Sequence, residues 1–112
     1  MLKLRKYGNV KKEIDGIEFD SIKEANRYQQ LKIMQSAKMI INLETQPVFI
    51  LQESFKIGKE THRAIKYIAD FKYTTNKGVA VIEDVKGMKT EVYKIKKKLL
   101  LFKFPDIVFL EI

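Results

Sequence analysis

The sequence predicts a single α/β domain in which a mixed four-stranded sheet is flanked by helices. Three observations lead to this prediction: two segments with helical periodicity, three consecutive strand-like segments between them, and one more strand-like segment at the end of the chain. The predicted order of elements is therefore αβββαβ. With 112 residues, the chain can bury one modest core but not two independent ones.

The N-terminal part of the chain divides into a basic arm and the beginning of the domain. Residues 1–12 are basic and show little periodicity, so we expect an arm that lies outside the domain formed by residues 13–112. Residues 13–19 alternate around Asp15-Gly16, a pair that favours a tight turn. A short hairpin is therefore expected at the start of the domain.

The first helix is predicted within residues 20–38. Asp20 or Ser21 can cap its N-terminus, because each carries a side-chain oxygen that accepts a backbone N–H. Apolar residues recur at helical spacing and define the side expected to face the core: Ile22, Ala25, Tyr28, Leu31 and Met34.

Three strands are expected to follow as a meander. After a short extended piece and a break at Gln46-Pro47, the first strand covers about residues 48–55. The second covers residues 62–74, and the third covers residues 79–86. The third is apolar on both faces, which predicts a central position in the sheet.

The second helix and the last strand complete the predicted domain. Thr90 caps a helix that runs to about Phe104, Pro105 ends it, and residues 106–112 form the last strand. The connection is long enough for a right-handed parallel crossover, so we expect a mixed sheet with a helix on each face. The side of this helix expected to face the core consists of Val92, Ile95, Leu99 and Phe102.

Composition narrows the classes of function. The 22 Lys and Arg residues outnumber the 14 Asp and Glu residues, which gives a net charge of +8 and favours a polyanionic partner, nucleic acid first. Many small basic proteins are merely soluble, so charge alone leaves both interpretations open. The absence of cysteine excludes disulfides and thiolate metal sites. With no secretory signal and no membrane-spanning apolar run, we expect a cytoplasmic protein.

Charged residues gather at the end of the third strand, in the segment VIEDVKGMKTE. Side chains alternate along a strand, so Asp84 and Lys86 face one way while Glu83 faces the other. If the loop before this strand has an odd number of residues, Asp70 lies opposite Ile82 and diagonal to Asp84, roughly 7–8 Å away. An even loop would place the two acids on opposite faces.

A divalent metal would compensate the cost of burying these acids. Mg²⁺ or Mn²⁺ could bind the carboxylates of Asp70 and Asp84 and the carbonyl of Val85, with water and a phosphate oxygen in the remaining positions. Lys86 could orient the attacking water or stabilise negative charge in the transition state. The chemistry indicated is phosphodiester hydrolysis. For any one of these residues, an ordinary ion pair is the alternative.

Glu24 is a further candidate. Ser21 to Glu24 matches the capping box S-x-x-E, in which the glutamate only folds back onto the helix N-terminus. Glu24 also shares a side with Tyr28 and Leu31, so it can reach the acidic end of the sheet. A direct or assisting role at the metal is the second interpretation.

Lysines of the second helix could contact phosphates. The candidates for DNA binding are Lys89, Lys94, Lys97 and Lys98, which follow the acidic segment. Solvation of an exposed helix face is the alternative. His62, the only histidine, is expected to be a surface residue.

These residues carry a resemblance to a known family. A helical Glu24, Asp70 at the end of YIAD, and Asp84 to Lys86 in EDVKG resemble the PD-(D/E)XK nuclease superfamily. Nearly the whole run from residue 13 to residue 112 is similar to small phage and prophage proteins of that superfamily, and to the endonuclease subunit of heteromeric transposases. One departure is Ala69, which stands where the motif has proline, at a position that contributes no ligand.

The resemblance implies a restriction-endonuclease-like fold and a metal-dependent DNA endonuclease that acts in phage or prophage DNA recombination or processing in a bacterial host. It implies that Asp70 and Asp84 bind the metal, that Lys86 is catalytic and that Glu24 assists. DNA is the expected partner, and a homodimer would allow a single-domain nuclease to cut both strands. The alternatives are a non-catalytic DNA-binding module of the same fold and a structural protein whose charges form ion pairs.

Overall fold

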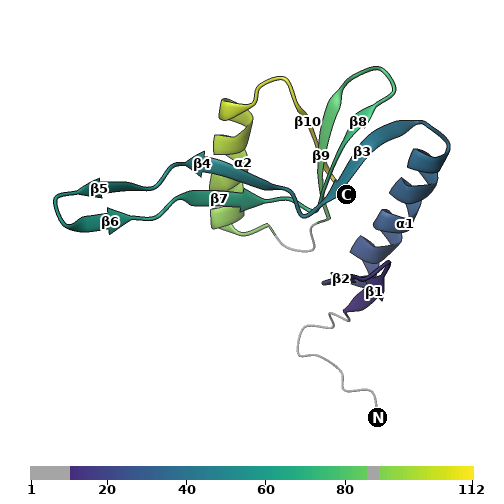
Figure 1. Ribbon diagram of the computed structural model, residues 1–112, viewed down its shortest axis with the longest axis horizontal. Coiled ribbons are helices and arrows are strands. Elements are labelled where there is room, and N and C mark those ends of the chain that lie inside the picture. The colour runs from purple at the N-terminus through teal and green to yellow at the C-terminus, as the bar shows by residue number, and fades with distance from the viewer. Residues whose placement is uncertain (1–10, 86–88) are drawn as a thin grey trace, which may run out of the picture.

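A computed structural model of the chain describes residues 11–85 and 89–112 and contains a mixed four-stranded sheet (Figure 1). The order across the sheet is β10 (Val108–Glu111), β9 (Ala80–Asp84), β8 (Phe71–Thr75) and β3 (Ile40–Thr45). Strand β8 pairs antiparallel with both β3 and β9, whereas β10 pairs parallel with β9. The predicted α/β class, the mixed four-stranded sheet and the central position of the segment before Asp84 are confirmed.

Two capped helices accompany the sheet. Helix α1 (Ile22–Ser36) begins after Ser21, whose Oγ accepts a hydrogen bond from the Glu24 N–H at 3.1 Å. Helix α2 (Glu91–Lys103) begins after Thr90, whose Oγ1 accepts one from the Tyr93 N–H at 3.1 Å. Both predicted caps are therefore formed.

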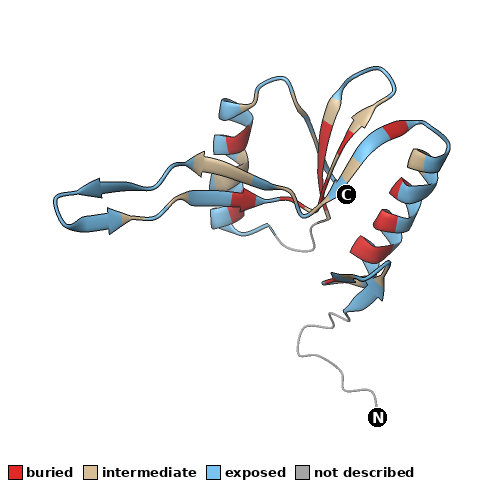
Figure 2. Cartoon of the chain, in the orientation of Figure 1, coloured by how far each residue is buried: buried red, intermediate tan, exposed pale blue. Residues whose placement is uncertain are grey.

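The core consists of two buried clusters, one for each helix. Alternation along β8 and β9 directs Phe71, Tyr73 and Val81 into the cluster of α1, while Ile82 belongs to the cluster of α2. In Figure 2 the buried residues accordingly mark the sheet and parts of both helices. The members contributed by α1 are Ala25, Tyr28 and Leu31, and those contributed by α2 are Tyr93 and Leu100. The prediction of one helix on each face is confirmed.

The short N-terminal hairpin is present as predicted. Strands β1 (Lys12–Ile14) and β2 (Ile17–Phe19) pair antiparallel. Asp15 and Gly16 connect them with φ values of +54° and +76°, the left-handed values that a two-residue type I′ turn requires. Residues 1–10 of the expected arm lie outside the described residues. No helix within the described ranges is both long and apolar enough to cross a membrane.

The pairing order of the predicted meander is present, but the first predicted strand and the first part of the second lie outside the main sheet. The segment predicted as a short extended piece is β3, the edge of the main sheet, whereas β4 (Val48–Gln52) pairs with β7 (Ile65–Ile68) in a separate two-stranded sheet. Strands β5 (Phe55–Ile57) and β6 (Glu60–His62) extend this pair. We call residues 48–68 the ribbon.

A bend separates the ribbon from the main sheet. On one strand Gln46 has a φ of +52° and Pro47 has no N–H to donate, and on the other the single strand predicted for residues 62–74 breaks at Ala69 and Asp70. Two hydrogen bonds join the breaks: Gln46 N–H to the Asp70 carbonyl at 2.9 Å, and Ala69 N–H to the Pro47 carbonyl at 3.1 Å. Both strands therefore bend at the same level.

The ribbon gives the molecule an extended shape. Its outer half, β5 and β6, projects away from the helices and the main sheet in Figure 1, whereas its base, β4 and β7, packs against α2. The Cα radius of gyration is 16.5 Å, whereas a compact domain of this length would have about 13 Å.

The predicted inward side of α2 is also wrong. Val92, Ile95, Leu99 and Phe102 are 61%, 59%, 42% and 88% exposed, while Tyr93 and Leu100 are buried. The helix is rotated by about one residue because the side chain of Tyr93 packs in the cluster of α2 and its O–H donates to Glu111 Oε2 at 2.7 Å. Periodicity could not decide the rotation, since residues 99–101 are all leucine.

The orientation of α2 predicts unequal costs at two adjacent leucines. Leu100 is fully buried, so Leu100→Ala should lower the free energy of unfolding by about 2–5 kcal/mol. Leu99→Ala, which removes the same atoms from an exposed side chain, should cost less than about 1 kcal/mol. Urea denaturation in dilute solution measures both values, and a larger loss for Leu99→Ala would refute the observed rotation.

Candidate functional site

Asp70 lies at the bend between β7 and β8 and is bonded to the end of β9. Its N–H donates to the Glu83 carbonyl at 3.1 Å, and its Oδ2 accepts a hydrogen bond from the Val85 N–H at 2.6 Å. Its own carbonyl accepts the Gln46 N–H of the bend. Backbone and side chain together therefore hold the Asp70 carboxylate against the segment that carries Asp84.

The register of the β8–β9 hairpin sets which acids lie side by side. Thr75 N–H donates to the Val79 carbonyl at 2.8 Å, which leaves the odd-numbered loop 76–78. Phe71 pairs with Glu83, so extending the register by one residue brings Asp70 level with Asp84. The prediction that Asp70 lies opposite Ile82 is wrong by two residues along β9, because Lys72 is the partner of Ile82, although the odd-numbered loop that it required is present.

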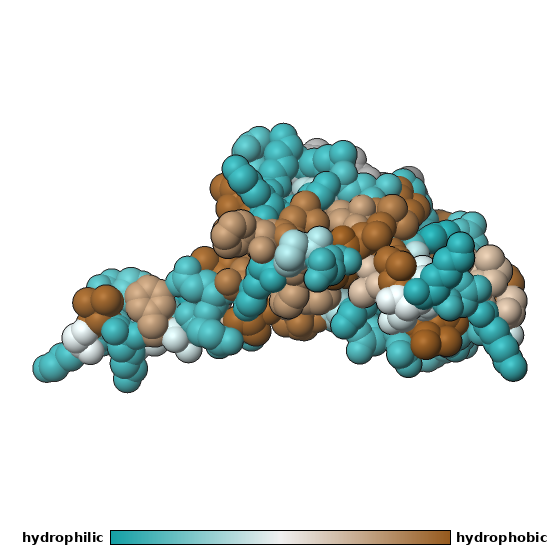
Figure 3. All heavy atoms as spheres, turned by 90° about the horizontal axis from the view of Figure 1, so that it is seen from above, coloured by the Kyte–Doolittle hydropathy of each residue, from teal (hydrophilic) through white to brown (hydrophobic). Residues whose placement is uncertain are grey.

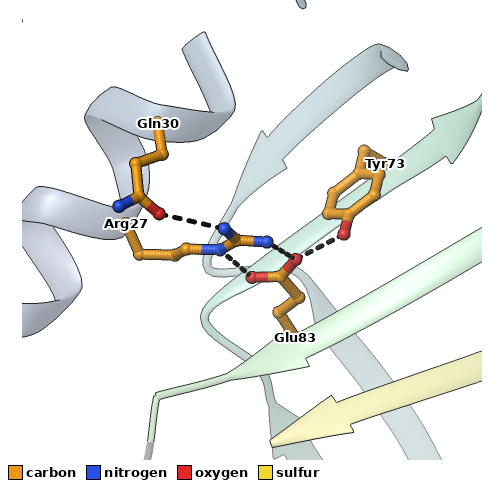
Figure 4. A network of polar contacts seen from close by, with 4 residues as sticks. All are labelled: Arg27, Gln30, Tyr73 and Glu83. Carbon is orange, nitrogen blue, oxygen red and sulfur yellow. Dashed lines mark hydrogen bonds and ion pairs between the residues drawn. The ribbon is translucent and has the colours of Figure 1, made fainter. Parts of the chain in front are cut away.

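Glu83 faces α1 and is neutralised there. Its fully buried carboxylate accepts hydrogen bonds from Arg27 Nε and Nη2, each at 2.7 Å, and from the O–H of Tyr73 (Figure 4). Burial, followed by the hydrogen bond to Glu83, raises the pKa of Tyr73, and hydrogen bonding to Glu83 raises that of Arg27. Glu83 is therefore a structural ion-pair partner.

Arg27 and Tyr73 were missed by the sequence analysis. A signal was present, because an acid in a strand that is apolar on both faces requires a cation, and Arg27 is the only arginine of α1. What the pattern could not supply was the pairing of this arginine with Glu83, 56 residues further along the chain.

Asp84 is fully buried and follows the alternation away from Glu83. The pKa of Tyr93 is raised first by burial, then by its hydrogen bond to Glu111, and further by the negative charges of Asp84, Glu111 and Asp70. The phenol of Tyr93 is thus within electrostatic range of both acids. It is a further member of the site, and the sequence analysis did not identify it.

Glu24 reaches Asp70 from α1. It is 6% exposed, and its pKa is raised to about 7 by burial first, then by the charge of Asp70 and by a hydrogen bond between the two carboxyl groups. The charge of Asp20 acts in the same direction, and a backbone hydrogen bond at Asp20 opposes it. Glu24 therefore combines the N-terminal position of a capping box with a place beside the acidic end of the sheet.

Asp70 and Asp84 are the residues of this group that could hold a hard divalent cation such as Mg²⁺ or Mn²⁺. Residues 11–85 and 89–112 contain no group of three His, Cys, Asp or Glu side chains spaced to hold a metal ion by themselves. Mg²⁺, however, usually takes only one or two carboxylates and completes its shell with water and substrate oxygens. Asp70 and Asp84 carry carboxylate oxygens at adjacent strand ends, and burial, followed by the charge of Asp70, raises the pKa of Glu24 beside them.

The other predicted site residues are Lys86, Val85 and two exposed lysines of α2. Lys86 lies outside the described residues, and the predicted role of the Val85 carbonyl stays a prediction. Lys94 is exposed and pairs with Glu91 at 3.3 Å, and Lys98 is exposed. His62 belongs to the ribbon, where it stacks on Phe55 with 4.7 Å between ring centroids.

Lys89 and Lys97 converge on Glu111, the residue of β10 that pairs with Asp84. Their Nζ atoms lie 3.3 and 3.1 Å from Glu111 Oε1. Donation from the Tyr93 O–H, together with these two lysines, lowers the pKa of Glu111 to about 2. Two of the four candidate lysines therefore lie beside the acidic end of the sheet.

Fold and site together define a mixed α/β domain with a group of buried carboxylates at the ends of its central strands. Residues 4–111 match the family described as "Protein of unknown function (DUF1064)", and the chain belongs to this family. No curated protein and no solved structure matches the chain.

The bonds between Arg27 and Glu83 predict a large loss of stability when the cation is removed. Arg27→Met leaves a buried carboxylate without its ion pair and should lower the free energy of unfolding by about 3–5 kcal/mol in urea denaturation. Gln30→Ala is the matched control on α1, because it removes only the exposed 3.0 Å contact with Arg27 and should cost less than about 0.5 kcal/mol. Adding Glu83→Met to Arg27→Met should restore most of the loss, since no buried charge then remains.

The raised pKa of Glu24 predicts that stability falls between about pH 4.5 and pH 7. Across this window the folded protein retains a proton that the unfolded chain has lost, so rising pH favours unfolding. In metal-free buffer, Glu24→Gln should therefore gain about 3 kcal/mol relative to the wild type between pH 4.5 and pH 8. Parallel stability curves for the two proteins across this range would contradict the assignment.

Proposed function

We propose that this chain is a divalent-metal-dependent DNA endonuclease with the restriction-endonuclease-like core of the PD-(D/E)XK superfamily. The observation that carries the proposal is the junction of Asp70 with the end of β9: its carboxylate accepts the Val85 N–H at 2.6 Å, beside the buried Asp84 and within reach of Glu24. The family to which the chain belongs has no described function, so the proposal rests on this geometry and on the motif.

In this proposal Asp70 and Asp84 hold Mg²⁺ or Mn²⁺, together with the carbonyl of Val85. The bound ion would acidify a water molecule and polarise the scissile phosphate. The Val85 N–H orients the Asp70 carboxylate, and Glu24 contacts the same carboxylate from α1. Glu83, engaged by Arg27 and Tyr73, keeps the neighbouring Asp84 directed to the opposite face.

Glu24 serves the site through its proton. Near neutral pH its carboxyl is close to its pKa of about 7, so it can hold a proton against Asp70 or release it as a cation binds. Lys86 is assigned, from its place in the motif, to the attacking water or to the transition-state charge. Lys89 and Lys97 would exchange Glu111 for phosphates when DNA binds. A role in phage or prophage DNA recombination rests on the resemblance alone.

Cleavage assays test this proposal. The purified protein is incubated with supercoiled, linear, single-stranded and four-way-junction DNA in Mg²⁺, Mn²⁺ or EDTA. We expect metal-dependent cleavage that Asp70→Asn, Asp84→Asn and Lys86→Ala each reduce by at least about a hundredfold, equivalent to about 2.7 kcal/mol of barrier. Asp106→Asn is the matched control, because it makes the same change at an exposed acid between α2 and β10.

Metal binding can be followed separately from cleavage. Mg²⁺ should raise the melting temperature of the wild type and of Asp106→Asn but not that of Asp84→Asn. Salt-sensitive DNA binding without cleavage of any substrate would instead support a non-catalytic DNA-binding module, which the net charge of +8 also permits. Absence of both cleavage and DNA binding would leave the ion-pair interpretation.

A further inference from the structure

The outward side of α2 and the base of the ribbon form an apolar groove of about 400 Å³. Its apolar lining comes from Ala64 and Ile65 of the ribbon and from Val92, Ile95 and Leu99 of α2. The side chains of Lys66 and Lys96 complete the lining. Exposed apolar surface bordered by charge is typical of a site at which another protein docks.

The outer part of the ribbon carries a complementary face. Phe55 pairs with His62, and Ile57 pairs with Glu60, so alternation places these four side chains on one face of the β5–β6 hairpin. Phe55 and Ile57 are 43% and 66% exposed, and the Glu60 side chain is 73% exposed. In Figure 3 apolar atoms are visible on the outer part of the ribbon as well as on the body of the molecule. This face therefore offers two apolar side chains and a carboxylate.

The outer half of the ribbon has little support from the rest of the molecule. Strands β5 and β6 contact chiefly each other, and a two-stranded hairpin by itself is marginally stable in water. Because β5 and β6 project away from the helices and the main sheet, their exposed face requires a second molecule to become buried.

We propose that two copies of this chain exchange ribbons, so that the outer face of each ribbon lies in the groove of the other copy. Phe55 and Ile57 would pack on Ile65, Ile95 and Leu99, and Glu60 would lie near Lys66 and Lys96. The contact is made twice around a two-fold axis, which closes the assembly as a dimer. The proposal depends on neither metal binding nor DNA cleavage.

Charge selects this arrangement over a dimer in which two α2 helices face each other. Helix α2 carries five lysines and one glutamate, so a helix-to-helix contact would bring like charges together. In the exchanged arrangement the carboxylate of Glu60 meets the lysines of the groove. The second copy thus supplies both the apolar surface and the opposite charge.

Disulfide trapping tests the proposal directly, because the natural chain contains no cysteine. Ile57→Cys and Ile95→Cys proteins are prepared separately, mixed and mildly oxidised without DNA or metal. We expect the mixture to give a linked heterodimer, with each protein alone giving at least about tenfold less linked product. Equal linking of Ile95→Cys protein with itself would indicate the helix-to-helix contact and overturn the proposal, as would the absence of linked product.

Sedimentation equilibrium provides the second test. The wild type should dimerise reversibly, and Ile57→Lys should raise the dissociation constant at least about tenfold, equivalent to about 1.4 kcal/mol. Ile33→Lys is the matched control, since Ile33 is 69% exposed on α1, outside the groove. Glu60→Lys should weaken the dimer, and combining it with Lys96→Glu should recover affinity. A wild type that stays monomeric at millimolar concentration would exclude ribbon exchange, whatever the outcome of the cleavage assays.

Discussion

The bend at Asp70 is the constraint on which the rest of the structure depends. A hairpin that continued straight from the main sheet into the ribbon would place residue 70 within a regular ladder, with its side chain fixed by pleating alone. At the bend, its N–H, carbonyl and carboxylate instead bind three different partners: Glu83, Gln46 and Val85. The same bend directs the ribbon away from the body of the molecule. One local break therefore both forms the acidic end of the sheet and exposes the ribbon.

The buried acids differ in how their negative charge is compensated. Four carboxyl groups, those of Glu24, Asp70, Glu83 and Asp84, lie near the ends of β8 and β9, and three of them are buried outright. Glu83 is compensated within the protein by Arg27 and Tyr73, so it contributes to stability without being available for chemistry. Glu24 and Asp70 lie so close that burial and mutual repulsion favour a shared proton. In the proposed function, a bound cation would remove the cost of ionising these groups.

Two surface features lie next to the buried groups: a pair of lysines and the apolar side of α2. Lys89 and Lys97 gather around Glu111 beside the acidic end of the sheet, so positive charge lies next to the buried carboxylates. The apolar side of α2 faces away from its own core and borders a groove at the base of the ribbon. Its apolar residues recur at helical spacing, as the residues of a buried side do. The structure thus separates two uses of one helix: Tyr93 and Leu100 hold it to the sheet, and the neighbouring stripe remains open to another chain.

The sequence by itself determined what depends on neighbours in the chain. Local spacing and turn chemistry set the caps at Ser21 and Thr90, the turn at Asp15-Gly16, the central strand and the odd-numbered loop of the β8–β9 hairpin. Tertiary structure alone decided the rotation of α2, the departure of the ribbon from the main sheet and the partnership of Arg27 with Glu83. Three consecutive leucines fit several rotations equally well, and a proline break does not say which side of it joins the sheet. These three features depend on contacts between residues that are distant in the chain. Local preferences leave several conformations nearly equal in energy, and burial and charge compensation decide among them.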